Sequence, residues 1–396
     1  MPPNPKAAHT IKALEMFQID PERGFLPARD PLQELPATFS AWEEIARDLP
    51  KLLAAGRARN TLEKLPVIDT TSLQGEREYQ RAMLLLSYFG HAYVWGEGGP
   101  PDRIPASIAV PWCEVAHKLG RPPILSYGSY ALHNWRRIDP SGPISLGNIA
   151  LLQNFLGGVD EEWFILVHVD IEAQAAPALS AILQGQEMVL EGRAADLVEY
   201  LATIASSLRG MYGTLLRMPE HCDPYIYFHR VRPYIHGWKD HPALPGGMVY
   251  EGVDAYGGKG QRFRGETGAQ STIIPSLDAA LGIAHGDDPL RPYLMEMREY
   301  APPKHRAFIE SVERGASIRD CVMRNAGHLP ALRDAYNECV HQIELFRSKH
   351  LEYAATYVQK QSLKSPYNPT EVGTGGTPFL PYLKKHRDET TGHKIF

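Results

Sequence analysis

The sequence predicts a mainly α-helical protein built from two parts. Apolar residues recur at steps of three and four over several long segments, which is the spacing of helices that bury one face. Convincing alternating strand patterns are few, so we expect little sheet. At 396 residues the chain exceeds the size at which a single core stops growing, roughly 250 to 300 residues, so two domains or one large domain are expected.

The elements are expected in the following order. The proline-rich first 40 residues predict extended chain, and helical spacing follows at 41–55 and 76–93. Charges mixed with Pro and Gly at 136–147 mark a domain boundary. We therefore expect a small, mostly helical N-terminal domain over residues 1–140 and a large helical domain over residues 141–396. The helices expected in the large domain lie at 173–191, 194–217, 276–283, 290–300, 303–315 and 331–358.

The composition is that of an ordinary globular protein, with 43% hydrophobic and 22% charged residues. A formal net charge of -5 gives no reason to expect a nucleic-acid or membrane-surface partner. The sequence has no run of 18 apolar residues and no signal-peptide pattern, which favours a cytoplasmic protein. The four scattered cysteines form no Cys-x-x-Cys pair, so we expect reduced, mostly buried thiols at Cys113, Cys222, Cys321 and Cys339.

The strongest candidate for chemistry is His350, which lies on the apolar stripe of the segment 331–358. It follows Ile343 in a series that also includes Tyr336 and Val340. An inward imidazole needs a partner for its nitrogens, and either a metal ion or a hydrogen bond in the core would provide one. Arg347, one turn earlier, would place a cation beside an acidic group of whatever His350 binds.

Another pair, His168 and Asp170, has the His-x-Asp spacing of non-haem iron sites. The two side chains would share a face on a strand, but on a helix they would diverge by about 200°. The periodicity around them is ambiguous, so the sequence leaves both structures open.

The segment 221–236 gathers three histidines, a cysteine and an aspartate, but at none of the spacings of structural zinc sites. Its interleaved aromatic and guanidinium groups suit a pocket for an aromatic carboxylate, or a half-buried segment whose arginines reach solvent. These residues are Tyr227, Phe228, Arg230, Arg232 and Tyr234.

Two glycine-rich stretches, 257–268 and 373–377, interrupt the helical part. Neither ends in Gly-Lys-Ser/Thr, so neither is a phosphate loop. They are either mobile connections or backbone that approaches a ligand closely and closes over it, the second one as a loop near 370–378.

Seven blocks of the sequence occur together in a specific order and spacing. They are 121–135 (RPPILSYGSYALHNW), 237–239 (GWK), 249–252 (VYEG), 268–271 (GAQS), 297–306 (MREYAPPKHR), 347–351 (RSKHL) and 373–377 (GTGGT). Over roughly residues 104–383 the chain therefore resembles the indoleamine 2,3-dioxygenases, haem enzymes that open the indole ring of tryptophan. The resemblance implies an all-helical large domain that holds haem b and a smaller N-terminal domain that covers its distal side.

The resemblance also implies roles for single residues. His350 matches the proximal ligand of the haem iron, Arg347 the partner of a haem propionate, and Asp278 a residue that supports Arg347. Arg232 matches the residue that binds the substrate carboxylate, and His168 falls at the distal position, where an imidazole would contact the indole N–H or bound oxygen. The other implied substrate-binding residues are Tyr127, Tyr130, Ala131, Phe164, Tyr227, Phe228, Gly268 and Thr374.

Three positions depart from the animal enzymes, so we expect a pocket of different volume and polarity. Tyr130 stands in place of a smaller residue, Tyr227 in place of phenylalanine, and His168 in place of serine. The expected reaction is cleavage of the indole C2–C3 bond of L-tryptophan or a related indoleamine by O2, giving N-formylkynurenine, with an unidentified electron donor. The alternatives are a haem enzyme of the same fold that rearranges a substituted tryptophan, as in the pyrrolnitrin pathway, and a haem-binding sensor without turnover.

Overall fold

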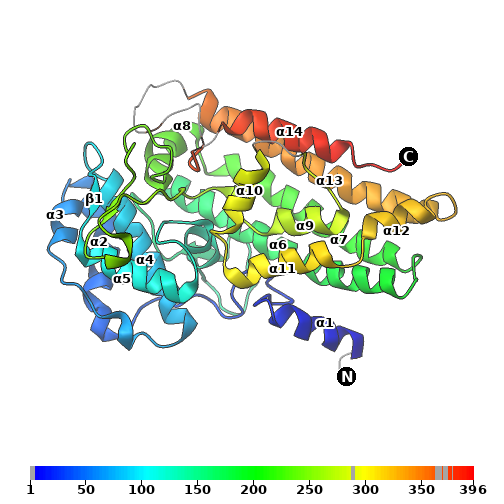
Figure 1. Cartoon of the computed structure of the whole chain (residues 1–396), viewed down its shortest axis with the longest axis horizontal. Coiled ribbons are helices and arrows are strands. Elements are labelled where there is room, and N and C mark those ends of the chain that lie inside the picture. The colour runs from blue at the N-terminus through cyan, green and yellow to red at the C-terminus, as the bar shows by residue number, and fades with distance from the viewer. Residues whose placement is uncertain (1–4, 287–289, 362–367, 369–372, 377) are drawn as a thin grey trace.

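The structure, a computed structural model, describes residues 5–286, 290–361, 368, 373–376 and 378–396. It confirms the mainly α-helical fold: long helices from the C-terminal two thirds lie side by side, and the helices of residues 40–119 gather at one end (Figure 1). The α-helices are α1 (Pro5–Glu15), α2 (Ser40–Ala54), α3 (Ala58–Glu63), α4 (Gly75–Trp95), α5 (Ala106–Leu119), α6 (Val159–Leu190), α7 (Leu197–Leu216), α8 (Pro224–Ile226), α9 (Ile273–Leu281), α10 (Leu290–Arg298), α11 (Pro303–Arg314), α12 (Ile318–Asn325), α13 (Pro330–Ala354) and α14 (Phe379–Thr391).

Strands occur only as two short pairs in the part of the chain that the structure describes. β1 (Arg103–Ile104) pairs in parallel with β4 (Val249–Tyr250), and β2 (Trp135–Arg137) pairs antiparallel with β3 (Ile149–Leu151). The first pair fastens the chain near residue 250 to the N-terminal helices. Residues from both parts of the sequence therefore meet close to the segments that carry the predicted site.

The predicted extended chain over the first 40 residues is wrong at its start, because Pro5–Glu15 forms α1. Proline is well tolerated at the first position of a helix, where its missing N–H would have no partner in any case. Leu14 is fully buried against the long helices of the second half, and this packing explains why the helix forms. The helices α5, α12 and α14 were also not expected from the sequence.

The ambiguous segment around His168 is helical, and α6 begins at Val159 instead of near residue 173. Of the described helices, α6 alone has the length and hydropathy of a membrane span, and 72% of its apolar window is buried inside the fold. It packs against α7, α9 and the N-terminal α1. Its apolar surface is thus covered by other helices, as in the core helix of a globular protein.

Two large hydrophobic cores fill the molecule. The first is built by α2, α4 and α5 together with residues 234–250, and the second by α6, α7, α9 and α13. Phe164 packs against both cores, so the N-terminal end of α6 lies where they meet. The division of the chain at residue 140 stays a prediction, since the first core also recruits side chains from well beyond that position.

Three short stretches are π-helical, with one residue more per turn than an α-helix: Gly128–Leu132, Tyr227–Val231 and Ala355–Gln359. Such turns are rare and often occur at functional sites. Two of them carry predicted substrate-binding residues, and the third follows the helix of His350. All three therefore belong to the neighbourhood of the candidate site.

Candidate active site

His350 lies in the last turns of α13, whose inner stripe is formed by Tyr336, Val340 and Ile343. Its side chain is solvent-accessible, yet the protein surrounds it closely enough that exclusion of water lowers its pKa to about 4, with His168 and Arg347 as further causes. Both observations fit an imidazole that faces a hollow inside the fold. No described residue makes a hydrogen bond or ion pair with this imidazole, so its nitrogens remain available for a ligand.

His168, on α6, contributes to lowering the pKa of His350. The two imidazoles therefore lie within electrostatic reach of each other. The Nδ1 atom lies 2.7 Å from the Phe164 carbonyl oxygen, which accepts only, so Nδ1 carries the proton. Burial lowers the pKa of His168, which keeps the imidazole neutral. Nε2 is then an unprotonated acceptor directed away from its own helix.

The metal alternatives find no support in the described residues, where no group of three or more His, Cys, Asp and Glu side chains is arranged to hold a metal ion. On α6, Asp170 is turned away from His168 and accepts hydrogen bonds from Thr214 (3.3 Å) and Gln174 (3.2 Å). The three histidines of the segment 221–236 also do not converge on a common centre with carboxylates or thiols. The His-x-Asp spacing of His168 and Asp170 was therefore misleading, whereas the spacings in the segment 221–236 had suggested no structural zinc site.

Arg347 and Asp278 form a buried ion pair at 2.6 Å. Burial raises the pKa of Asp278, but the charge of Arg347 and the hydrogen bond with His285 outweigh it, so the pKa lies below its ordinary value. Arg347 also donates to Thr390 of α14, while Oδ1 of Asp278 is buried without a partner. Arg347, the predicted propionate partner, and Asp278, its predicted supporting residue, are thus in contact. The Oδ1 atom of Asp278 can still accept a hydrogen bond.

The predicted aromatic residues form one continuous cluster around Phe164. Its ring centroid lies 4.8 Å from that of His168, 4.6 Å from Tyr227 and 6.4 Å from Tyr130. The centroid of the Tyr127 ring lies 6.0 Å from that of His168. Tyr127 and Ala131 are both buried in a third, smaller hydrophobic core. The Tyr130 hydroxyl is buried without a partner. An apolar, planar ligand fits such a ring-lined space.

Arg232 and Phe228 lie at the edge of this cluster, on the π-helical turn and the 3-10 helix that follows it. The Arg232 guanidinium carbon lies 5.5 Å from the centre of the Phe228 ring, and the side chain is buried. Arg232 donates to the side-chain oxygen of Asn368, whose nitrogen donates to the Phe228 carbonyl at 2.6 Å. The amide oxygen of Asn368 therefore accepts the hydrogen bond from Arg232 that a ligand carboxylate would accept.

The two glycine-rich stretches meet beside Arg232. The Thr374 hydroxyl donates to the Glu266 carbonyl, and a Cβ placed on Gly268 would meet no atom within 4 Å. Gly268 therefore borders open space, as expected of a residue beside a ligand. Thr377 and residues 370–372 of the predicted closing loop lie outside the described residues.

Two buried carboxyl groups of this region were missed by the sequence reasoning. Glu172, one turn after His168, accepts hydrogen bonds from Tyr127 (2.8 Å) and Ser271 (3.1 Å), and burial raises its pKa to about 7. Glu266 is also buried, and burial raises its pKa to about 8. The glycines around Glu266 drew attention to the backbone of 257–268, but no spacing rule pointed to its side chain.

The residues fit the haem that the resemblance implies. His350 is an inward imidazole with no partner in the described chain, and a second imidazole lies opposite it. A guanidinium with a supporting carboxylate stands one turn from the proposed ligand, where the acidic edge of a porphyrin would be neutralised. The donor set is a single histidine, as haem requires, and not the three or four ligands of a bare metal ion.

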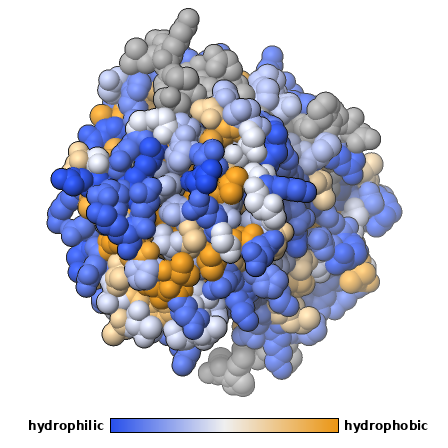
Figure 2. Space-filling model, turned by 60° about the vertical axis from the view of Figure 1, so that its left-hand side comes forward, coloured by the Kyte–Doolittle hydropathy of each residue, from blue (hydrophilic) through white to orange (hydrophobic). Residues whose placement is uncertain are grey.

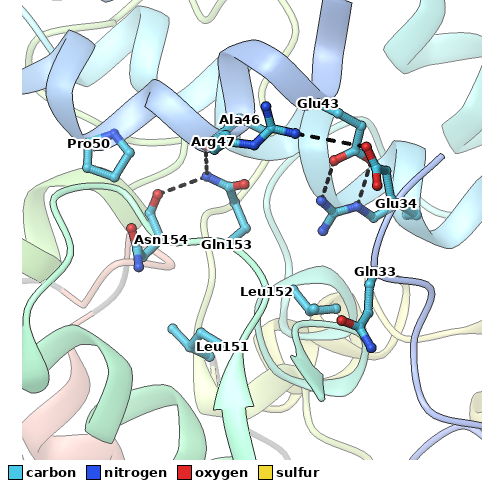
Figure 3. A pocket seen from close by; sticks show the side chains of 11 residues that line it. Gln33, Glu34, Glu43, Ala46, Arg47, Pro50, Leu151, Leu152, Gln153 and Asn154 are labelled. Carbon is cyan, nitrogen blue, oxygen red and sulfur yellow. Dashed lines mark hydrogen bonds and ion pairs between the residues drawn. The ribbon is translucent and has the colours of Figure 1, made fainter. Parts of the chain in front are cut away.

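An open surface pocket of about 420 Å³ lies elsewhere, between α2, α4 and the chain after β3. Figure 3 shows the Gln153 amide, which donates to the backbone carbonyls of Ala46 and Asn154. Arg81, another lining residue, pairs with Glu43 at 2.6 Å. None of the lining residues belongs to the predicted site, so we assign the chemistry to the region around His350.

Comparisons with known proteins show the family of the chain. A family model described as indoleamine 2,3-dioxygenase matches residues 13–393. The chain is 39% identical over 393 residues to indoleamine 2,3-dioxygenase 1 of Rattus norvegicus, covering 96% of this chain and 95% of the rat protein. It is 35% identical over 401 residues to indoleamine 2,3-dioxygenase 2 of Homo sapiens (98% and 97% covered) and 34% over 441 residues to the Saccharomyces cerevisiae enzyme (98% and 96%). The chain belongs to the indoleamine 2,3-dioxygenase family.

Proposed function

We propose that this protein is a haem-dependent dioxygenase that cleaves the indole C2–C3 bond of L-tryptophan, or a related indoleamine, with O2 to give N-formylkynurenine. The observation that carries the proposal is His350, an imidazole without a partner among the described residues, which lies within electrostatic reach of His168 and one helical turn from the Arg347–Asp278 pair. Membership of the family, whose enzymes depend on haem, supports the same conclusion. When bound, ferrous haem supplies the binding and activation of dioxygen.

The protein's own residues bind and orient the substrate. The rings of Phe164 and Tyr227 would hold the indole and exclude water, while Phe228 supports the neighbouring guanidinium. Arg232 would bind the substrate carboxylate in two parallel hydrogen bonds, displacing the Asn368 oxygen. The Thr374 hydroxyl would close over the same end of the substrate. Tyr127, Tyr130, Ala131 and Gly268 would form the remaining walls.

His168 would position the indole ring. Its Nδ1 proton is held by the Phe164 carbonyl, so Nε2 is free to accept the indole N–H. The neutral state follows from burial, which lowers its pKa. A distal imidazole in this state orients the substrate and removes no proton at the start of the reaction.

The first test is the absorption spectrum of the purified protein, ferric and dithionite-reduced under CO, with and without L-tryptophan. We expect a histidine-ligated Soret band that shifts when tryptophan is added and disappears in His350→Ala. His341→Ala, which removes an exposed imidazole from the same helix, should keep the band. The product should gain two oxygen atoms, which excludes rearrangement and a sensor without turnover. A colourless protein that cannot be reconstituted with haem would overturn the proposal.

The role of His168 is tested with L-tryptophan methylated at the indole nitrogen, which cannot donate to Nε2. The wild-type protein should prefer tryptophan, and His168→Ala should lose this preference by on the order of tenfold, the value of one hydrogen bond. His168→Gln, which retains an acceptor, should preserve part of it. An equal loss of kcat/KM for both compounds in His168→Ala would contradict the assigned hydrogen bond.

The electron donor and the location in the cell are proposed in general terms. We propose that an electron donor reduces the haem and that the protein acts in the cytoplasm, without nucleic-acid or membrane partners. All four cysteines are free thiols, which supports a reducing compartment. Incubation of the ferric protein with cell extract, read as appearance of the ferrous CO spectrum, tests for a cytoplasmic donor.

A further inference from the structure

Glu266 is a buried carboxyl group without a counter-ion. The residue is 4% exposed, and no described residue makes a hydrogen bond or ion pair with its side chain. Burial is the sole cause that raises its pKa, to about 8. An unpaired buried carboxylate is costly, and most buried carboxylates have partners. The position therefore implies a partner that is not among the described residues.

The backbone of Glu266 is fixed between the two segments that hold the charged end of the site. Its N–H donates to the Ile235 carbonyl at 3.1 Å, at the end of the 3-10 helix that begins with Arg232. Its carbonyl accepts from the Thr374 hydroxyl, and Thr374 in turn accepts from the Gly237 N–H at 3.4 Å. These bonds place Glu266 beside Arg232 and the glycine-rich loop.

The side chain of Glu266 acts on the inner pocket. Its charge contributes to raising the pKa of four phenols that line or border the pocket, those of Tyr88, Tyr127, Tyr130 and Tyr227. Tyr227 is also influenced by Arg232, whose positive charge acts on its pKa in the opposite direction. The carboxyl group of Glu266 and the guanidinium group of Arg232 therefore both lie within electrostatic reach of the Tyr227 phenol, and their effects on its pKa have opposite signs.

We propose that Glu266 binds the ammonium group of the substrate, so that Arg232 and Glu266 together select compounds by their two opposite charges. The proposal rests on the proposed function and deepens it, because it names the group that specifies the amino end of the substrate. An ammonium ion in contact with Glu266 supplies the missing positive charge and recovers the cost of burying the carboxylate. The site then recognises indole compounds with a primary ammonium on the side chain, with or without a carboxylate.

The test is equilibrium binding of four compounds to the haem-loaded protein, followed by the Soret band and by calorimetry. L-Tryptophan carries both charges, tryptamine only the ammonium, indole-3-propionate only the carboxylate, and 3-methylindole neither. In Glu266→Gln we expect Kd to rise on the order of thirtyfold or more for tryptophan and tryptamine, and little for the other two. Arg232→Ala should give the mirror pattern, with the losses on tryptophan and indole-3-propionate.

Glu266→Asp keeps the charge and separates recognition from folding: it should recover part of the tryptamine affinity that Glu266→Gln loses. Equal losses on all four compounds in Glu266→Gln, or none on any, would overturn the role of Glu266 while tryptophan binding by the wild type still stands. A wild-type protein that binds none of the four compounds would overturn the proposed function and this role together.

Discussion

Three side chains carry the candidate chemistry because they have polar atoms without partners among the described residues. His350 has no hydrogen-bond partner, and Nε2 of His168 and the carboxyl of Glu266 have none among the described residues either. Many other buried polar groups have partners: His91 bonds the Tyr234 carbonyl and the Leu125 N–H, and Arg81 pairs with Glu43, although its Nη1 atom has no partner among the described residues. Since satisfied groups are the rule, the exceptions indicate where ligands bind.

Glu266→Gln should stabilise the substrate-free protein, and increasingly so as pH rises. Burial raises the pKa of Glu266 from the ordinary 4.5 to about 8, so between these values the folded state keeps a proton that the unfolded state has lost. The wild type therefore loses stability relative to the variant from about pH 4.5 to about pH 8, and the gap is constant above. The full gap is on the order of a few kcal/mol. Burial also raises the pKa of the four nearby phenols, which keeps them neutral here.

Scanning calorimetry of the haem-loaded protein between pH 5 and pH 9 measures this gap as a difference in Tm. Glu389→Gln is the control of opposite sign. Burial raises the pKa of Glu389, but hydrogen bonds with Lys385 and His285 outweigh it and lower the pKa to about 2. Between pH 5 and pH 9 that variant should have a lower Tm than the wild type by a gap that does not change with pH, because the wild type loses this stabilisation only as pH falls from about 4.5 towards 2. A Tm gap for Glu266→Gln that does not change with pH would refute the assignment.

At the scale of elements, the strap formed by residues 263–268 positions the charged end of the site. The N–H groups of Trp238 and Lys239 donate to the Phe263 carbonyl at 2.8 and 2.9 Å, and Glu266 bonds Ile235. Gly237 and Gly265 cross at close range: a Cβ on Gly237 would lie 2.1 Å from the Gly265 nitrogen. Only glycines permit this approach of two backbones.

Gly237→Ala should therefore separate the strap from the segment that carries Arg232. We expect a lower Tm and a tryptophan affinity reduced by about tenfold or more, because a misplacement of about 1 Å is costly at a binding site. Gly246→Ala, with no atom within 4 Å of the added Cβ, is the matched control and should change stability by no more than about 0.5 kcal/mol. Unchanged binding of tryptophan by Gly237→Ala would show that the strap does not position the site.

The helices differ in how well the sequence specified them. The apolar stripe of α13 predicted its extent and the position of His350, because one face is buried and the other is polar. In α6 apolar residues occur on several faces, since the helix is covered by neighbours over much of its surface, and the 3.6-residue period is weak. No local sequence pattern predicts the three π-helical turns, because their backbone is stabilised by tertiary contacts.

At the scale of the whole molecule, the site lies where two hydrophobic cores meet. Phe164 packs against both, and the segment 234–250 joins the N-terminal core although it belongs to the second half of the chain. The face in Figure 2 carries hydrophobic residues in groups interrupted by hydrophilic ones, and the polar pocket of Figure 3 lies on the N-terminal part, away from this junction.

The sequence by itself determined the helical class, most long helices and, through the seven ordered blocks, the family; it also predicted His350 as the central residue. These features depend on periodicity and on short local motifs, which a chain displays without being folded. The tertiary structure alone decided that His168 and Asp170 diverge, that Pro5–Glu15 is helical, and that Glu266 lies beside Arg232 and four phenols without a partner. Such facts arise from segments that are distant in the sequence and packed in the fold, where burial changes the charge state and the available partners of each group.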